Sequence, residues 1–325
     1  MNTIPTSKPR LLAAALFFAA LAAFPLLKLD FYNELLARIA IFAIFAVSLD
    51  LLVGYTGLVT LGHAAWFGIG GYTFALLSTQ YEISASLWLT LPLAILLTAL
   101  LSAFVGLFVL RTKGLFFIMV TLAFAQVFYF LFHDVKAIGG STDGINLYTK
   151  PTATIGSVTL FDLENPLTLY YFIVAMLLLV VALTLIVLRS PFGRAIQGIR
   201  ANEHRMKSIG FPVFRYKLAA FTLSGAIAGL AGYLFAVLTD GVNPDLLSWH
   251  QSADVLLMLI FGGVGTVWGA ILGAFTFALL KELLMSTTQL WHLWLGLVIV
   301  FAVLFLPDGL ASLGRRIKAL LEKKP

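Results

Sequence analysis

A few ionisable and amide side chains interrupt long apolar stretches of this sequence, and they are the residues most able to do chemistry. Asp50 and Asp254 stand in or beside such stretches, and Gln126 lies within another, near Thr121. Ionisable groups are costly among apolar residues, so each needs a functional or a structural partner. The aspartates could guide a substrate or relay protons. Alternatively, they cap helix ends or accept hydrogen bonds from backbone groups near glycines. Gln126 and Thr121 would form hydrogen bonds across helices, or would point into a pore.

No constellation typical of an enzyme stands out. We find no Ser/His/Asp or paired-carboxylate arrangement in a polar segment, and no His, Asp and Glu cluster with metal-site spacing. Cysteine is absent, which excludes disulfides and thiol chemistry. The glycine-rich run at 139–144 lacks the Gly-Lys-Ser/Thr of a phosphate-binding loop and predicts exposed turns. We expect no catalytic residue, no metal and no cofactor in this chain.

The composition identifies the class of protein. Hydrophobic residues make up 61% of the 325 residues and charged residues 11%, with a mean hydropathy of +1.00. A soluble domain could not shield so much apolar surface, so the sequence predicts a polytopic membrane protein with one all-α domain over 1–325. The net charge of +6 comes from basic residues in short segments between apolar runs. That pattern is typical of membrane topology and argues against nucleic-acid binding.

The elements that would position the candidate residues are apolar runs of about 20 residues, the length that crosses a bilayer. We expect about 8–10 transmembrane helices, some of them broken at glycine. The run at 252–264 is too short to cross alone, so it is either a half-helix or merges with its neighbour. The candidate spans are 11–28, 35–54, 58–79, 87–110, 114–132, 167–188, 218–238, 252–264, 266–284 and 289–306.

The distribution of Lys and Arg predicts the orientation, because basic residues collect on the cytoplasmic side. With ten crossings, most of the 21 basic residues fall in segments on one side. This predicts a cytoplasmic N-terminus (1–10), a cytoplasmic loop (189–217) and a cytoplasmic C-terminal tail (308–325). The longest loop on the other side, 133–166, is then periplasmic.

The 189–217 loop is predicted to contain a short amphipathic helix. Ser190 is a good N-cap, Pro191 fits the first helical position, and Gly210 is a credible stop. Gly198 is expected to divide the helix into two pieces. A structured loop between two spans indicates a docking element of a transporter. The residues assigned to it are Ser190, Pro191, Gly193, Arg194, Ile196, Ile199, Arg200, Asn202, Glu203 and Gly210.

Glycines within the apolar runs fall in three groups, partly at a spacing of four residues. This spacing lets helix backbones approach closely. The alternative is that helices broken at glycine line a transport path. The residues assigned to packing or to the path are Gly54, Gly57, Gly62, Gly70, Gly225, Gly229, Gly265, Gly269 and Gly273, together with Asp50, Gln126 and Asp254.

Several sequence blocks resemble, in order, permease subunits of branched-chain amino acid ATP-binding cassette (ABC) importers, of the LivM type. Each block alone is weakly specific, but together they cover nearly the whole chain. Asp50 stands where that family often has Asn. The blocks are 49–72, 114–117 with 121–122, 139–144, 190–194 with Arg200, Asn202 and Glu203, 224–225 with 228–232, 262–266 and 307–309.

The resemblance implies an ABC importer permease fold in a bacterial inner membrane. It also implies a second, LivH-like permease subunit, two cytoplasmic ATPases that would bind ATP and magnesium, and a periplasmic binding protein. The substrate would be leucine, isoleucine and valine, or alternatively urea, short amides or aromatic acids. From the residues alone, two other classes stay open: an ion-driven secondary transporter that uses Asp50 and Asp254, and a membrane enzyme.

Overall fold

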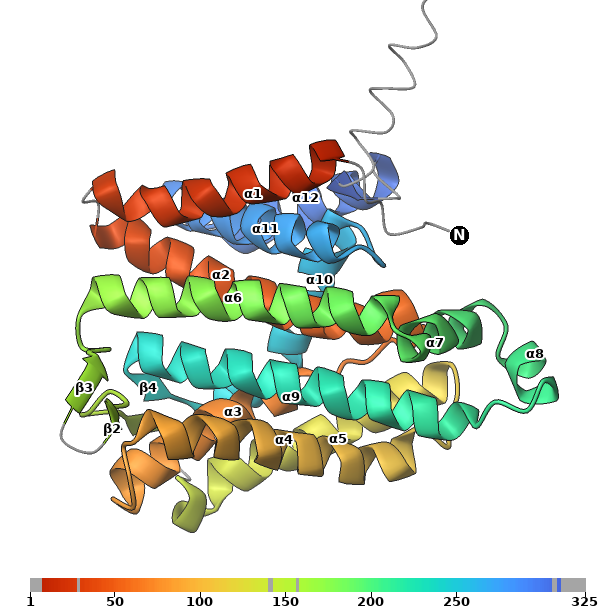
Figure 1. Cartoon of the computed structure of the whole chain (residues 1–325), viewed down its shortest axis with the longest axis horizontal. Helices are drawn as coiled ribbons and strands as arrows, with labels where there is room; N and C mark the ends of the chain where they lie inside the picture. The colour runs from red at the N-terminus through yellow and green to blue at the C-terminus, as the bar shows by residue number, and fades with distance from the viewer. Residues whose placement is uncertain (1–7, 28–29, 140–142, 156–157, 306–308, 311–325) are drawn as a thin grey trace, which may run out of the picture.

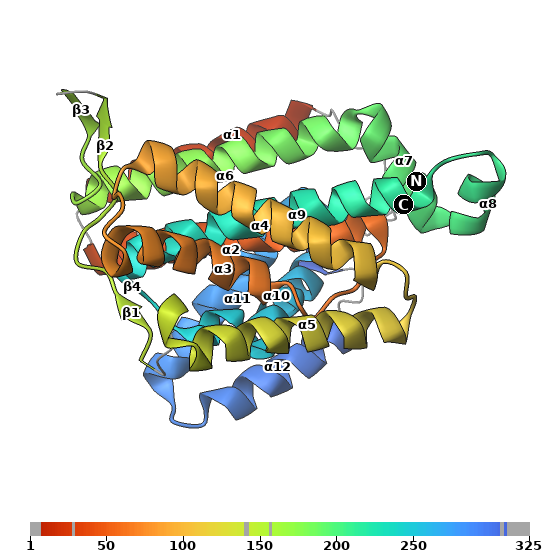
Figure 2. The same cartoon turned by 90° about the horizontal axis from the view of Figure 1, so that it is seen from below.

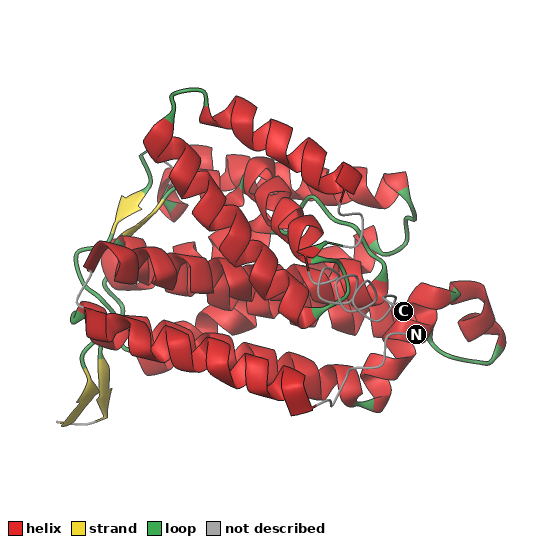
Figure 3. Cartoon of the chain, turned by 90° about the horizontal axis from the view of Figure 1, so that it is seen from above, coloured by secondary structure: helices red, strands yellow, loops and turns green. Residues whose placement is uncertain are grey.

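The protein is a bundle of long helices with very little strand, as the composition predicts (Figure 3). The computed structural model describes residues 8–27, 30–139, 143–155, 158–305 and 309–310. The helices are α1 (Lys8–Ala23), α2 (Asp30–Asp50), α3 (Ala64–Ala75), α4 (Leu87–Val109), α5 (Leu115–Asp134), α6 (Pro166–Arg189), α7 (Pro191–Ala201), α8 (Glu203–Ser208), α9 (Val213–Thr239), α10 (Trp249–Gly262), α11 (Val267–Thr287) and α12 (Trp291–Phe305).

Short irregular helical segments extend or link these helices. Two of them are π-helical and continue α2 and α3 directly. The segments are η1 (Phe24–Leu27), η2 (Leu51–Thr56), η3 (Leu76–Gln80), η4 (Lys136–Ile138) and η5 (Pro244–Leu247).

Each of the ten predicted spans contains a helix, but the helices differ in length. Six among the described residues are long and apolar enough to cross a membrane: α2 continued by η2, α4, α5, α6, α9 and α11. The others are shorter, with 16 residues in α1, 12 in α3, 14 in α10 and 15 in α12. The expectation of an all-α polytopic protein is confirmed.

Two of the short helices settle questions that the sequence left open. The run at 252–264 forms a separate helix, α10, which does not merge with α11 because Gly263 and Gly265 adopt positive φ angles of 110° and 84°. The predicted span 58–79 was wrong in its first part. Residues 57–63 form a non-helical connection, so that α3 begins only at Ala64.

Helix α9 lies at the centre of the bundle, packed against α3, α4 and α2 (Figures 1 and 2). On one side α2 also contacts α6 and α11, and α11 pairs with α10. Aromatic rings tilted against one another fill the space between α2, α3 and α9. The ring centroids of Phe45 and Phe67 lie 4.6 Å apart, and those of Phe67 and Phe235 lie 5.4 Å apart.

The loops predicted to face opposite sides lie at opposite ends of the bundle. Strands β2 (Ala153–Ile155) and β3 (Val158–Phe161) form a hairpin at one end, and α7 and α8 lie at the other (Figure 1). At the first end, β1 (Ile145–Asn146) also pairs antiparallel with β4 (Gly241–Val242). The sequence had not predicted these strands. Residues 1–7 and 311–325 of the two predicted cytoplasmic termini lie outside the described residues, as do 140–142 of the glycine-rich run.

Candidate coupling and transport site

The predicted docking segment forms two helices, α7 and α8, that project from one end of the bundle (Figure 1). Ser190 caps α7, accepting a hydrogen bond at Oγ from the Gly193 backbone N–H at 3.3 Å, and Pro191 fills the first position. Asn202 caps α8 through a 2.9 Å bond from the Arg205 N–H to its Oδ1. The break therefore falls at Asn202, and the expectation of a break at Gly198 was wrong.

One face of α7 is anchored in the bundle and the other is open. Ile196 and Ile199 are buried, and the ring of Phe192 stacks on Tyr216 of α9 with centroids 5.7 Å apart. Arg194 on the same helix is exposed. Gly210 has a φ of +87°, which ends the segment in a left-handed turn. Helix α7 is thus seated on the bundle with a basic outer face, whereas α8 has no buried residue.

Glu203 fastens α8 to its neighbours. Its carboxylate lies 2.6 Å from Nζ of Lys217 on α9, 2.7 Å from Lys207 and 3.9 Å from Lys113. Partial burial alone would raise the pKa of Glu203. The hydrogen bonds and charges of Lys207 and Lys217 outweigh this effect and lower the pKa to about 2. Glu203 was predicted as a docking residue; in this chain its carboxylate is occupied by internal ion pairs.

Arg200, near the end of α7, reaches back toward the bundle. A Cβ atom added at Gly57 would lie 3.1 Å from Cγ of Arg200, and one added at Gly265 would lie 3.0 Å from Nη1. Both glycines have positive φ angles, 77° and 84°, which disfavour larger residues. The Arg200 side chain therefore occupies the junction between the end of η2 and the turn that joins α10 to α11.

Asp50 binds that same turn from inside the bundle. Its Oδ1 accepts a 2.7 Å hydrogen bond from the backbone N–H of Gly265, and the side chain is fully buried. This is the structural alternative that the sequence had left open. The other carboxylate oxygen, Oδ2, is buried with no hydrogen-bond partner within the described residues. Arg200 supplies an electrostatic attraction to this carboxylate.

Asp254 has a charged partner instead of the predicted cap or backbone bond. Its Oδ2 accepts a 2.9 Å hydrogen bond from Nζ of Lys281, which links α10 to α11. The Lys281 ammonium also lies 5.6 Å from the centroid of the Trp291 ring. Of the alternatives that the sequence left open for Asp254, the structure thus shows neither a helix cap nor a backbone bond, but an ion pair with Lys281.

The predicted glycines lie where helix backbones nearly touch. Gly70 of α3 faces the carbonyl of Gly229 on α9, and Gly225 faces the Ser102 side chain of α4. On the other side, Gly269 and Gly273 of α11 pack against Gly262 of α10 and its neighbours. Gly62 abuts the Thr121 carbonyl of α5, and Gly54 abuts Asp50 and Gly265. The close-packing interpretation therefore accounts for these positions.

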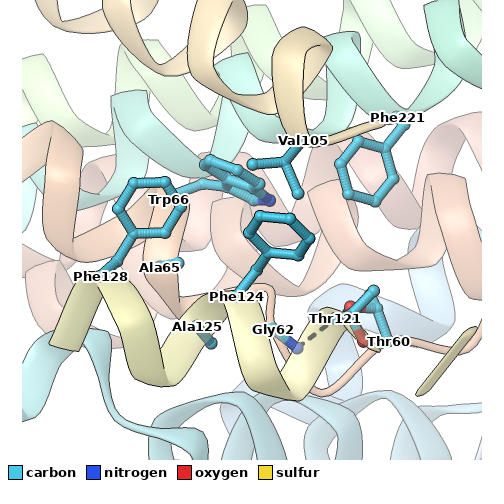
Figure 4. Close-up of a pocket in the computed structure, with 10 residues that line it drawn as sticks. All are labelled: Thr60, Gly62, Ala65, Trp66, Val105, Thr121, Phe124, Ala125, Phe128 and Phe221. Atoms are coloured by element: carbon cyan, nitrogen blue, oxygen red, sulfur yellow. Dashed lines mark hydrogen bonds between the residues drawn. The ribbon is translucent and has the colours of Figure 1, made fainter. Parts of the chain in front are cut away.

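An aromatic pocket lies between α3, α4, α5 and α9 (Figure 4). Trp66, Phe124 and Phe128 form much of its wall. Thr121 also lines it, but its hydroxyl bonds to the carbonyl of Ile118 on its own helix, so the expected bond across helices does not form. The full lining is Thr60, Gly62, Ala65, Trp66, Val105, Thr121, Phe124, Ala125, Phe128 and Phe221.

Gln126 is half-buried on α5 and is not part of this lining. Its side chain makes no hydrogen bond within the described part of the chain. In the same part of the chain, no group of three His, Cys, Asp or Glu residues is placed to hold a metal ion.

Comparison with known proteins gives consistent matches over most of the chain. The family model described as the permease component of the branched-chain amino acid transport system matches residues 31–306. The high-affinity branched-chain amino acid transport system permease proteins LivM of Salmonella typhimurium and Escherichia coli are each 32% identical over 95% of this chain and 76% of their own length.

More distant permeases also match. The ribose import permease protein RbsC of Haemophilus influenzae is 23% identical over 82% of this chain and 78% of its own. No solved structure matches.

Proposed function

Because the chain belongs to the branched-chain amino acid transport system permease family, we propose that it is the membrane permease subunit of an ABC importer for leucine, isoleucine and valine. The cargo is inferred from the names of the two LivM relatives, which this chain matches over nearly its full length. The RbsC relative is named for ribose import, but its identity to this chain is lower. We therefore place amino acids before sugars.

The observation that carries the proposal is the form of the α7–α8 segment. A helix that follows Ser190 is buried on one side at Ile196 and Ile199 and presents Arg194 on the other. An element that is rigid and seated on the bundle can pass a movement from a docked partner to the spans. A flexible loop of the same length could not. The proposed partners at this surface are two cytoplasmic ATPase subunits.

The remaining parts of the proposed machine follow from the same assignment. A second, LivH-like permease pairs with this chain, and a periplasmic binding protein delivers the amino acid. The chain lies in a bacterial inner membrane with both termini in the cytoplasm. ATP and magnesium belong to the ATPases, so the permease itself is not an enzyme.

The ion-driven alternative required free carboxylates within the spans. Asp254 is paired with Lys281, and Asp50 accepts the Gly265 N–H. Each carboxylate thus has a structural partner, which favours the ATP-driven proposal over a carrier that uses these two residues.

Reconstitution tests the proposal directly. The chain is co-expressed with its candidate partner permease and ATPases, and the complex is placed in vesicles with the binding protein outside. We expect leucine uptake that requires ATP inside and that persists when ionophores collapse the proton and sodium gradients. Uptake that follows an ion gradient without the ATPases would contradict it. Calorimetry of the purified binding protein with leucine, valine, urea and aromatic acids identifies the cargo.

A further inference from the structure

Three segments that are far apart in the sequence meet around the side chain of Arg200. Its aliphatic stem lies against Gly57 at the end of η2, and its guanidinium lies against Gly265 in the turn between α10 and α11. Arg200 itself belongs to α7, the helix of the proposed docking element that packs on the bundle. Its side chain thus links the docking helix to η2 and to the turn between α10 and α11.

The glycines make this arrangement possible. A Cβ at Gly265 would approach both Nη1 of Arg200 and the carbonyl oxygen of Gly54, at 3.0 and 3.1 Å. At such distances a neighbour must shift, and the positive φ of Gly265 adds strain for any larger residue. Glycine at position 265 therefore leaves room at this turn for the guanidinium of Arg200.

Asp50 completes the junction from the other side. Its Oδ1 holds the Gly265 N–H, whereas its Oδ2 is buried and has no hydrogen-bond partner within the described residues. A buried carboxylate oxygen without a donor is costly, and a guanidinium is the donor best suited to two carboxylate oxygens. The guanidinium of Arg200 lies against Gly265, the residue bound by the other oxygen of Asp50, so a movement of α7 toward the turn would bring it to Oδ2.

We propose that Arg200 is the positioning residue that carries movement of α7 into the bundle, by pushing on the Gly265 turn and closing onto the free oxygen of Asp50. This inference rests on the proposed function, because it assumes that an ATPase moves α7. The turn between α10 and α11 is well placed to pass this movement on, because it joins the two helices directly. Displacing it shifts the ends of both helices at once.

The test compares Arg200→Gln, Arg200→Lys and a control, Arg111→Gln, in the reconstituted importer. Arg111 is an exposed arginine on the α4–α5 connection, so its variant has the same change in charge. Uptake per ATP hydrolysed should fall about tenfold in Arg200→Gln, a typical size for coupling between sites. Arg200→Lys keeps the charge and the stem but loses the fork, and should fall by less. Arg111→Gln should match the wild type.

Two cysteine probes separate this inference from the proposed function. The chain has no cysteine, so each probe is unique in it. His204→Cys, exposed on α8, reports docking through a crosslink to the ATPase. Val264→Cys, exposed in the turn, reports movement through its rate of maleimide labelling with and without ATP.

In Arg200→Gln we expect the crosslink to persist while the ATP-dependent change at Val264→Cys disappears. Arg200→Lys should retain part of that change. If the labelling change and coupled uptake both survive in Arg200→Gln, the role of Arg200 is refuted while docking stands. If the crosslink fails in the wild type, the proposed function itself fails. Loss of the crosslink in Arg200→Gln alone would also overturn the inference, since it would make Arg200 a docking residue.

Discussion

Oε2 of Glu203 and Nζ of Lys217 lie 2.6 Å apart, and this ion pair joins the first residue of α8 to the first turns of α9. The Lys217 side chain is only 13% exposed, compared with 51% for Lys207, the other close partner. Screening by solvent is therefore weaker in the Glu203–Lys217 pair. The position of α8 depends more on Lys217 than on Lys207.

Removal of Lys217, the more buried of the two close partners of Glu203, should loosen α8. We expect Lys217→Met to raise amide exchange across 203–208 about fivefold, the equivalent of about 1 kcal/mol, because α8 loses its tie to α9. Hydrogen exchange followed by mass spectrometry measures it. Lys207→Met is the matched control and should change exchange by less than about twofold. Equal effects in the two variants would contradict the ranking of the two pairs.

The same carboxylate predicts how α8 responds to pH. The pKa of Glu203 is lowered from 4.5 to about 2 in the folded chain. The ionised carboxylate therefore stabilises the position of α8 fully above pH 4.5, and this stabilisation is lost as the pH falls toward 2. A spin label at His204→Cys, which also removes the neighbouring histidine, should keep constant mobility from pH 8 to 5. Mobility should rise only below about pH 4. A transition near pH 6 would show that another group controls α8.

The contact between α3 and α9 should not tolerate a methyl group. Gly232→Ala would drive a Cβ into the carbonyl of Phe67, and Gly70→Ala would do the same to Gly229. We expect each to destabilise the protein by about 1–3 kcal/mol, the usual cost of overpacking. Gly296→Ala is the control, since a Cβ there meets nothing within 4 Å. Thermal unfolding in detergent, read by size exclusion, compares the three. An unchanged midpoint for Gly232→Ala would refute backbone contact.

The Asp254–Lys281 pair should show strong coupling between its members. Asp254→Asn or Lys281→Met alone leaves one charge uncompensated and should cost about 1–3 kcal/mol, between the exposed and the buried extremes. The double variant should recover much of that loss. A double-mutant cycle on the thermal midpoint measures the coupling. Additive effects would mean that the two charges act independently.

Two variants of Asp50 should separate the effect of its hydrogen bond to the Gly265 backbone from the effect of its charge. Asp50→Asn keeps an oxygen that accepts the Gly265 N–H, so we expect near-native stability. Asp50→Ala leaves that N–H without its partner and should cost about 1–3 kcal/mol. Thermal unfolding of the two variants provides the comparison. Equal stability in both would show that the hydrogen bond contributes little.

Local signals in the sequence were sufficient for much of the fold. Helix lengths follow from apolar runs, and Ser190 and Gly210 mark the ends of the docking segment by their usual capping chemistry. The break at Asn202 had a readable signal as well, because Asn is a favoured N-cap. Gly198 was the wrong choice because a glycine within a short helix can also serve close packing, here against Met206.

The site depends on contacts that no local pattern reveals. Asp50 finds its donor 215 residues away at Gly265, and Arg200 meets Gly57, which is also far from it in the sequence. The sequence placed Asp50 and Arg200 in separate roles, on the path and on the docking surface. Only the folded arrangement brings them to one junction. The non-helical start of the third span was likewise missed, although Gly57 and Gly62 interrupt its apolar residues.

Helices α3 and α9 meet with backbone against backbone at Gly70, Gly229 and Gly232, so almost no compressible side chain separates them. Two rods held in that way cannot slide or tilt against each other without losing contact along their length. They must travel as a single block during the transport cycle. The transport path therefore cannot open between α3 and α9.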